Sequence, residues 1–181
     1  MTSSIDRFND LPDSEARDLL VSCLAVERWI DEVASGRPYD DKPDALAQAG
    51  QSAQHLSDDE LATALARHPR IGEQLPTDEA EAAQSRREQS GVEDDEATEA
   101  ALREANRAYE RKFDRVFLIR AAGRSTGEIL SELERRISND ECTEKAETVA
   151  QLREIALLRL DAALEPDAAL EADAALEADA S

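Results

Sequence analysis

The residues best suited to chemistry are one histidine and one short polar cluster. The histidine begins the run His68-Pro69-Arg70-Ile71-Gly72, in which proline restricts the backbone and glycine permits a tight turn. A rigid backbone there can hold the imidazole in a cleft, where it could act as a general acid or base near neutral pH. A histidine at a helix end can equally be structural, facing the negative end of the helix dipole. Spacing alone leaves both interpretations open.

The polar cluster is Ser85-Arg86-Arg87-Glu88-Gln89. On a helix Ser85, Glu88 and Gln89 are three and four positions apart and share one face, whereas the two arginines point elsewhere. A hydroxyl, a carboxylate and an amide on one face could bind a ligand rich in amide groups. The same pattern is also typical of a solvated helix surface, so this cluster too has two interpretations.

A further candidate is Arg159, which lies between leucines in Leu157-Leu158-Arg159-Leu160. Its guanidinium could extend past apolar surface to water, or it could be a fixed cation for a carboxylate. No pair of histidines or cysteines has the spacing of metal ligands, and no glycine-rich phosphate loop occurs. The remaining candidates suit acid–base chemistry on a small polar substrate, without a metal or other cofactor.

Helical periodicity predicts the elements that would position these residues. Ser57 and Ser125 each begin a capping box, and Pro69 should end the helix before it. The apolar run 116–119 is too short to assign by period and could be extended. No stretch alternates like a strand, so the sequence predicts an all-α, single-domain helical bundle over residues 1–160. The helices are expected at about 13–35, 44–55, 57–67, 77–89, 95–113, 125–137 and 141–160.

Residues 161–181 differ from the rest, because they repeat a six-residue unit that begins Asp-Ala-Ala-Leu-Glu. They contain seven acidic residues and no basic ones. A six-residue step does not match the 3.6-residue helical period, so the repeated leucines form no single apolar stripe. The sequence therefore predicts a disordered or partly helical acidic tail without a chemical role.

Composition excludes several kinds of partner. The 181 residues carry a formal net charge of -21, which argues against binding to nucleic acid or anionic membranes. No apolar run approaches the roughly 18 residues that span a bilayer, and no signal peptide is recognisable at the start. Cys23 and Cys142 are expected to be reduced, packed thiols. These features predict a cytoplasmic protein.

Several motifs occur in a fixed order along the chain. They are Phe8-Asn-Asp-Leu-Pro12, Glu27-Arg-Trp29, His68-Pro-Arg-Ile-Gly-Glu73, Ser85-x-x-Glu88-Gln89, Asn106-x-x-Tyr109-x-x-Lys112-Phe113, Phe117-Leu-Ile-Arg-Ala121 and Leu158-Arg-Leu160. In this order they resemble the 2-oxo-4-hydroxy-4-carboxy-5-ureidoimidazoline (OHCU) decarboxylase family over about residues 5–160. The combination of His-Pro-x-x-Gly with Ser-x-x-Glu-Gln is the most specific part of the resemblance. Asp114 stands where the family usually has glycine.

The resemblance implies a cofactor-free, all-helical homodimer that converts OHCU to (S)-allantoin and carbon dioxide in urate degradation. By resemblance, His68 is the catalytic proton donor and Glu88 acts beside it. The substrate-binding residues that it implies are Pro69, Ser85, Arg86, Arg87, Glu88, Gln89, Phe117, Leu118, Ile119, Arg120, Ala121 and Arg159.

A different class of function remains possible from the residues alone. The acidic composition, the repeat tail and the 3% aromatic content would also suit a non-enzymatic acidic helical interaction module. That alternative leaves the motifs around His68 and Glu88 unexplained. A family member that has lost its activity is a third possibility, against which the presence of both residues argues.

Overall fold

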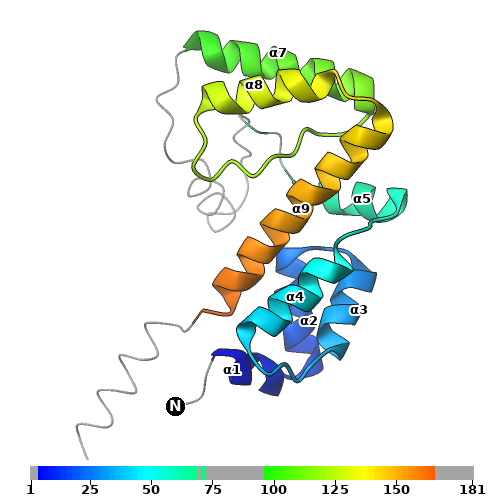
Figure 1. Ribbon diagram of the computed structural model, residues 1–181, viewed down its shortest axis with the longest axis vertical. Helices are drawn as coiled ribbons and strands as arrows, with labels where there is room; N and C mark the ends of the chain where they lie inside the picture. Colours follow the sequence, from blue (N-terminus) through cyan, green and yellow to red (C-terminus); the bar gives the residue numbers. More distant parts are fainter. Residues whose placement is uncertain (1–3, 69–70, 72–95, 166–181) are drawn as a thin grey trace, which may run out of the picture. The chain divides into compact units, whose positions relative to one another are not determined.

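The protein is described by a computed structural model that covers residues 4–68, 71 and 96–165. α-Helices account for most of these residues, and no strand occurs among them (Figure 1). The all-α fold predicted from the sequence is confirmed. The helix expected at 77–89 lies outside the described residues. The helices are α1 (Ser4–Asp10), α2 (Asp13–Cys23), α3 (Glu27–Ser35), α4 (Lys42–Ser52), α5 (Asp58–Leu65), α7 (Glu96–Phe113), α8 (Thr126–Ile137) and α9 (Glu141–Ala163).

The chain divides into two compact units, and α9 contributes residues to both. One unit is Met1–Ser52 with Ala156–Ser181, and the other is Ala53–Ile155. Helix α9 continues three residues past the end predicted at 160, and Leu164 beyond it is only 2% exposed. The predicted tail therefore begins with residues that belong to the fold, whereas 166–181 lie outside the described part.

The single helix predicted over 13–35 is wrong, because the chain leaves the helical conformation after Cys23. Leu24 and Val26 are extended, and α3 begins at Glu27. On one straight helix, Leu24 and Trp29 would lie outside the predicted apolar face. The break lets both be buried, at 2% and 0% exposure. The indole of Trp29 then donates a hydrogen bond to the carbonyl oxygen of Ala49 in α4, at 2.9 Å.

Helix α4 begins beside the end of α9 in the same unit. The ammonium group of Lys42 lies 2.7 Å from the carboxylate of Asp161 and also pairs with Glu165. The sequence placed His55 within the helix expected at 44–55, but α4 ends at Ser52 and His55 lies in the following connection. His55 is exposed, as predicted.

Both predicted capping boxes are confirmed in the Ala53–Ile155 unit. At the start of α5, the backbone N–H of Glu60 donates to Ser57 Oγ, and the backbone N–H of Ser57 donates to the Glu60 carboxylate. Ser125 and Glu128 repeat the arrangement at the start of α8. Each box satisfies two backbone N–H groups that a helix start would otherwise leave unpaired, which is why these boundaries could be predicted from the sequence.

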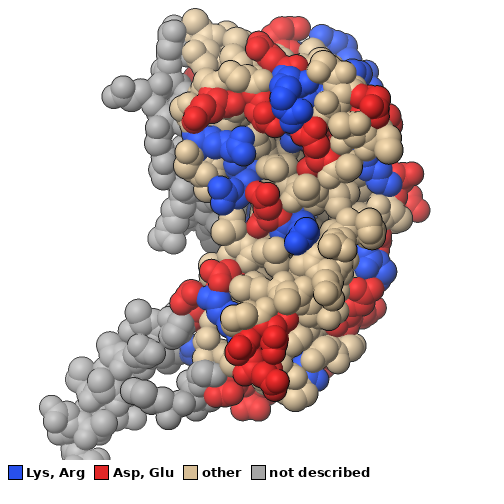
Figure 2. Space-filling model, in the orientation of Figure 1, with Lys and Arg blue, Asp and Glu red and all other residues tan. Residues whose placement is uncertain are grey.

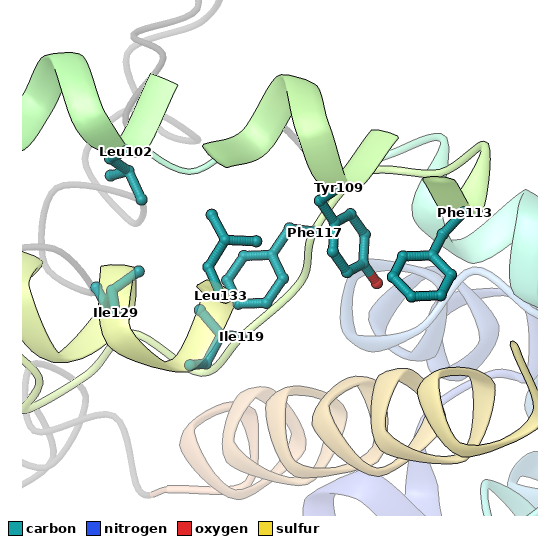
Figure 3. Packing of buried hydrophobic residues seen from close by; sticks show 7 residues of the cluster. All are labelled: Leu102, Tyr109, Phe113, Phe117, Ile119, Ile129 and Leu133. Atoms are coloured by element: carbon teal, nitrogen blue, oxygen red, sulfur yellow. The ribbon is translucent and has the colours of Figure 1, made fainter. Parts of the chain in front are cut away.

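Helices α7 and α8 lie side by side, and the segment 114–125 returns along them to the start of α8 (Figure 1). A hydrophobic cluster fills the space between these elements (Figure 3). The ring of Tyr109 contacts two other rings of the cluster, with centroid distances of 4.8 Å to Phe113 and 5.2 Å to Phe117. The cluster consists of Leu102, Tyr109, Phe113, Phe117, Ile119, Ile129 and Leu133.

The turn after α7 depends on one residue with a positive φ angle. Asp114 has a φ of 51°, in the left-handed region that glycine adopts most easily. Aspartate tolerates this region better than most residues, because its short side chain can bond locally. An aspartate at the position where the resemblance implies glycine is therefore compatible with this turn.

Acidic and basic side chains are interspersed on the face shown in Figure 2, with Lys and Arg beside Asp and Glu. On α3, Arg28 and Glu32 form an exposed pair at 3.0 Å. Nowhere in the described ranges is a helix both long and apolar enough to cross a membrane.

Candidate active site

His68 lies immediately after α5, at the helix end where the sequence placed it. Its backbone N–H donates to the carbonyl oxygen of Leu65 at 2.9 Å, which continues the last turn of the helix. The side chain is half-buried, and Nδ1 of the ring lies 2.9 Å from the carbonyl oxygen of Ala64. Both the backbone and the ring of His68 are therefore held by α5.

The contact with Ala64 determines which nitrogen of the imidazole can exchange a proton. A carbonyl oxygen only accepts hydrogen bonds, so Nδ1 must carry a proton to form this contact. The other nitrogen, Nε2, is then the one that gains or loses a proton when His68 titrates. This arrangement, with Nδ1–H bound to a backbone carbonyl, is the usual way in which a protein selects the working nitrogen of a histidine.

The chain just after His68 is fixed to α7. The amide group of Asn106, itself 5% exposed, donates to the carbonyl oxygen of Ile71 at 3.1 Å. The side chain of Ile71 also packs against the hydrophobic cluster that contains Phe117 and Ile119. The histidine motif and the run 117–121 are thus connected to the same core, which the order of motifs in the sequence could not reveal.

Pro69 and the cluster Ser85, Arg86, Arg87, Glu88 and Gln89 lie outside the described residues. The pairing of His68 with Glu88 accordingly stays a prediction.

The second predicted binding segment, Phe117–Ala121, is not helical. The apolar run there is too short to assign by period, and an extended conformation is one of the possibilities. Phe117, Leu118 and Ile119 are buried. The side chains of Phe117 and Ile119 point into the cluster, and Ala121 packs against it (Figure 3). Side chains two positions apart share one side, which is the alternation of an extended backbone.

Two polar side chains that the sequence analysis did not single out hold this segment. Arg136 of α8 donates from Nη1 to the carbonyl oxygen of Leu118 at 2.8 Å. Gln151 of α9 accepts the backbone N–H of Arg120 at its Oε1, also at 2.8 Å. Charged and amide residues on a helix usually indicate a solvated face, so periodicity gave no sign that these two turn inward.

Arg136 forms a buried ion pair with Glu144, with the two side chains 1% and 0% exposed. Nε and Nη2 of Arg136 both donate to Oε1 of Glu144, and Nη2 also donates to Thr148. The Glu144 carboxylate accepts further bonds from Tyr109 and Asn139. A buried charge pair is tolerated only when such additional bonds satisfy it, and this one is well satisfied.

Arg159 lies in the other unit, where it is half-buried on α9. Its Nε atom is buried and has no hydrogen-bond partner among the described residues. Burial raises the pKa of Cys23, in the same unit, to about 11. The hydrogen bond with Ser22 and the positive charge of Arg159 oppose this rise with smaller effects. Cys142, in contrast, is exposed, so the expectation of two packed thiols holds only for Cys23.

Among the residues that the structure describes, no group of three or more His, Cys, Asp or Glu side chains is arranged to hold a metal ion.

The fold and the site together define an all-α protein with a histidine-based candidate site. The chain belongs to the OHCU decarboxylase family, since the family model matches residues 9–161, most of its length. The resemblance seen in the motifs is confirmed by this match. Family membership also confirms the predicted enzyme class, a decarboxylase of the carboxy-lyase type.

Solved structures agree on the fold. A crystal structure of an OHCU decarboxylase in the presence of (S)-allantoin is 22% identical, with a TM-score of 0.65 over 79% of this chain and 94% of that one. An (S)-allantoin synthase is 16% identical, with a TM-score of 0.63 over 88% of this chain. This chain spans about half of that synthase, 53%. No curated protein matches the chain.

Proposed function

We propose that this protein catalyses the decarboxylation of OHCU to (S)-allantoin and carbon dioxide in urate degradation. The observation that carries the proposal is membership of the OHCU decarboxylase family over residues 9–161. The crystal structure of the similar decarboxylase was determined in the presence of (S)-allantoin, which supports the proposal. We propose further that the reaction needs no metal or organic cofactor.

The chemistry can be written with the substrate itself as the electron acceptor. The bond between the ring carbon and the carboxylate breaks, carbon dioxide leaves, and the electron pair moves into the adjacent ring imine. The imine nitrogen that receives the electron pair takes up a proton. The neighbouring carbon, which bears the ureido group, then takes a second proton, and the hydroxyl loses its proton to become the ring carbonyl. One enantiomer results only if the proton arrives on one face.

His68 is our candidate for that proton donor. The contact between Nδ1 and Ala64 leaves Nε2 as the nitrogen that exchanges a proton. A positioned general acid contributes about 10²–10⁴-fold to a rate. Glu88 would stabilise the protonated imidazole, because a nearby carboxylate favours the charged form of histidine.

The remaining predicted residues would bind the substrate. Ser85, Gln89 and the backbone of Phe117–Ala121 would contact the ureido and ring amide groups, and Pro69 would line the site. Arg159 would bind a carboxylate or a ring oxygen. Tight binding of the carboxylate itself would stabilise the substrate as much as the transition state, so it would not accelerate the reaction.

The proposal includes a homodimer in the cytoplasm, as the family resemblance and the highly charged composition suggest. Light scattering on the purified protein would give the oligomeric state. A monomer at all concentrations would contradict that part without affecting the proposed reaction.

The decisive experiment adds the protein to freshly generated urate-oxidation product and follows (S)-allantoin by circular dichroism. Wild type should form it faster than the spontaneous reaction. His68→Ala should lower the catalysed rate by about 10²–10⁴-fold while keeping the helical far-ultraviolet spectrum. His55→Ala changes the other, exposed histidine and should be as active as wild type. An inactive wild-type protein would contradict the proposal and favour the interaction module.

A further inference from the structure

Two side chains from neighbouring helices bind the backbone of the segment Val116–Ala121 at residues two positions apart. The carbonyl oxygen of Leu118 accepts a hydrogen bond from Arg136, and the N–H of Arg120 donates one to Gln151. In an extended chain, the backbone N–H and C=O groups of alternate residues point to the same edge. Residues 118 and 120 therefore present their backbone groups to the edge occupied by Arg136 and Gln151.

The residue between them has the opposite orientation. The N–H and C=O of Ile119 point to the other edge, and within the described part of the chain neither group has a hydrogen-bond partner. Ile119 is only 6% exposed. Unpaired backbone groups in buried residues are rare because they cost free energy. A donor and an acceptor side by side match the N–H and C=O of a substrate amide.

We propose that Arg136 and Gln151 are positioning residues of the substrate site, which act by occupying one edge of this segment and so orienting the other toward the substrate. This inference rests on the proposed function, in which Phe117–Ala121 contact the substrate. Neither side chain is placed in contact with the substrate itself.

The surroundings of Arg136 explain why it can hold a backbone so firmly. Its guanidinium lies 4.8 Å from the centroid of the Phe117 ring and donates to Glu144 and Thr148 as well as to Leu118. A planar group with several fixed donors can meet these acceptors together, whereas the single ammonium of lysine cannot. The same side chain thereby orders both the ring and the backbone of the segment.

A substitution of Gln151 tests the proposal more clearly than one of Arg136, because Gln151 is half-buried and can be changed without removing a buried charge. Gln151→Met removes the acceptor of the Arg120 N–H and keeps the size of the side chain. Gln151→Glu keeps an acceptor oxygen. The matched control is Gln48→Met, which removes a half-buried glutamine whose bond to Ser52 lies within α4.

The expected result is a change in KM, because backbone contacts to the amide groups serve substrate and transition state alike. Gln151→Met should raise KM about five- to tenfold, as expected for one weakened hydrogen bond, with kcat within about twofold of wild type and an unchanged pH profile. Gln151→Glu should restore most of the affinity, and Gln48→Met should behave as wild type. Amide hydrogen exchange at Arg120 should become faster in Gln151→Met alone.

Two outcomes would overturn the inference. One is a KM in Gln151→Met equal to that of Gln48→Met. The other is a lower kcat with an unchanged KM, which would indicate a smaller active fraction and hence a purely structural role. An inactive wild-type protein is distinguishable from both, since it would refute the proposed function on which the inference depends.

Discussion

The hydroxyl of Tyr109 donates a hydrogen bond to Oε1 of Glu144, 2.5 Å away, and both side chains are fully buried. The same oxygen accepts two bonds from Arg136. Helices α7, α8 and α9 each contribute one of these three residues. The ionised carboxylate thus links three helices of the Ala53–Ile155 unit, and its bonds give the stability predictions below.

Tyr109→Phe should lower the free energy of unfolding by about 1.5–3 kcal/mol, because the lost bond has a charged acceptor. Tyr39→Phe is the matched control, since that hydroxyl donates to a neutral backbone carbonyl, of Val33, at 2.7 Å. It should cost about 0.5–1.5 kcal/mol. Urea denaturation of the three proteins measures the difference, and equal losses would show that the charge of Glu144 adds nothing.

Alkaline pH should destabilise the protein partly through Tyr109. Burial, with the hydrogen bond to Glu144, raises the pKa of Tyr109 to about 12, whereas an unfolded tyrosine titrates near about 10. Between these values the unfolded chain loses a proton that the folded protein keeps. The free energy of unfolding therefore falls as pH rises over this range.

The slope of that fall should be smaller in Tyr109→Phe than in wild type. Cys23, with a pKa raised to about 11 by burial, contributes with the same sign in both proteins and does not affect the comparison. Denaturation curves between pH 9 and pH 12 would provide the slopes. Identical slopes would mean that Tyr109 does not titrate differently in the folded and unfolded states.

The two cysteines should differ in reactivity. A thiolate is the reactive form, and burial keeps Cys23 protonated near neutral pH, whereas Cys142 is exposed. A thiol reagent at about pH 8 should label one cysteine quickly and the second only after unfolding. Cys142→Ser should abolish the fast phase, and a fast phase that persists in this variant would show that Cys23 is accessible.

Removal of the ion pair at Arg136 should be costly. Arg136→Met leaves Glu144 buried without its cationic partner, which typically costs about 3–5 kcal/mol. Arg135→Met changes the adjacent, exposed arginine, which pairs with Glu132 and Glu147 at the surface, and should cost at most about 1 kcal/mol. Thermal unfolding of both variants gives the comparison, and similar losses would contradict the assignment of a buried pair.

The C-terminal repeat should matter only at its beginning. Leu164→Ala should lower the free energy of unfolding by about 2–5 kcal/mol, as for other buried leucines. Deletion of residues 166–181 should leave both stability and turnover unchanged, because the sequence predicts no chemical role for them. A marked loss of turnover in the deletion variant would assign them one.

Local rules predicted much of this fold. The capping boxes at Ser57 and Ser125 fixed the starts of α5 and α8, because the two bonds of each box lie within four consecutive residues. The break after Cys23 was not predictable in this way. It depends on burying Leu24 and Trp29, which is a matter of packing and not of helical period.

In the candidate site too, contacts between neighbouring residues could be predicted from the sequence, whereas contacts that depend on packing could not. The position of His68 at a helix end followed from Pro69 directly after it, and its ring contact with Ala64 is local. The hydrogen bond from Arg136 to Leu118 spans 18 positions of the sequence, and the one from Arg120 to Gln151 spans 31 positions. Such contacts form only when the helices pack against this segment. In the sequence, the charged side chain of Arg136 and the amide of Gln151 therefore looked like surface groups.

The bond between Nδ1 of His68 and the carbonyl oxygen of Ala64 has a consequence for handedness. A half-turn of the ring about its Cβ–Cγ bond would put Cδ2 in the place of Nδ1 and Cε1 in the place of Nε2. Because that rotation would break this bond, the main chain of α5 holds the imidazole in one orientation. Any proton that His68 delivers leaves along a single direction. The enantioselectivity of such a proton transfer would then originate in the backbone carbonyl of Ala64, which acts through the imidazole and not by contact with the substrate.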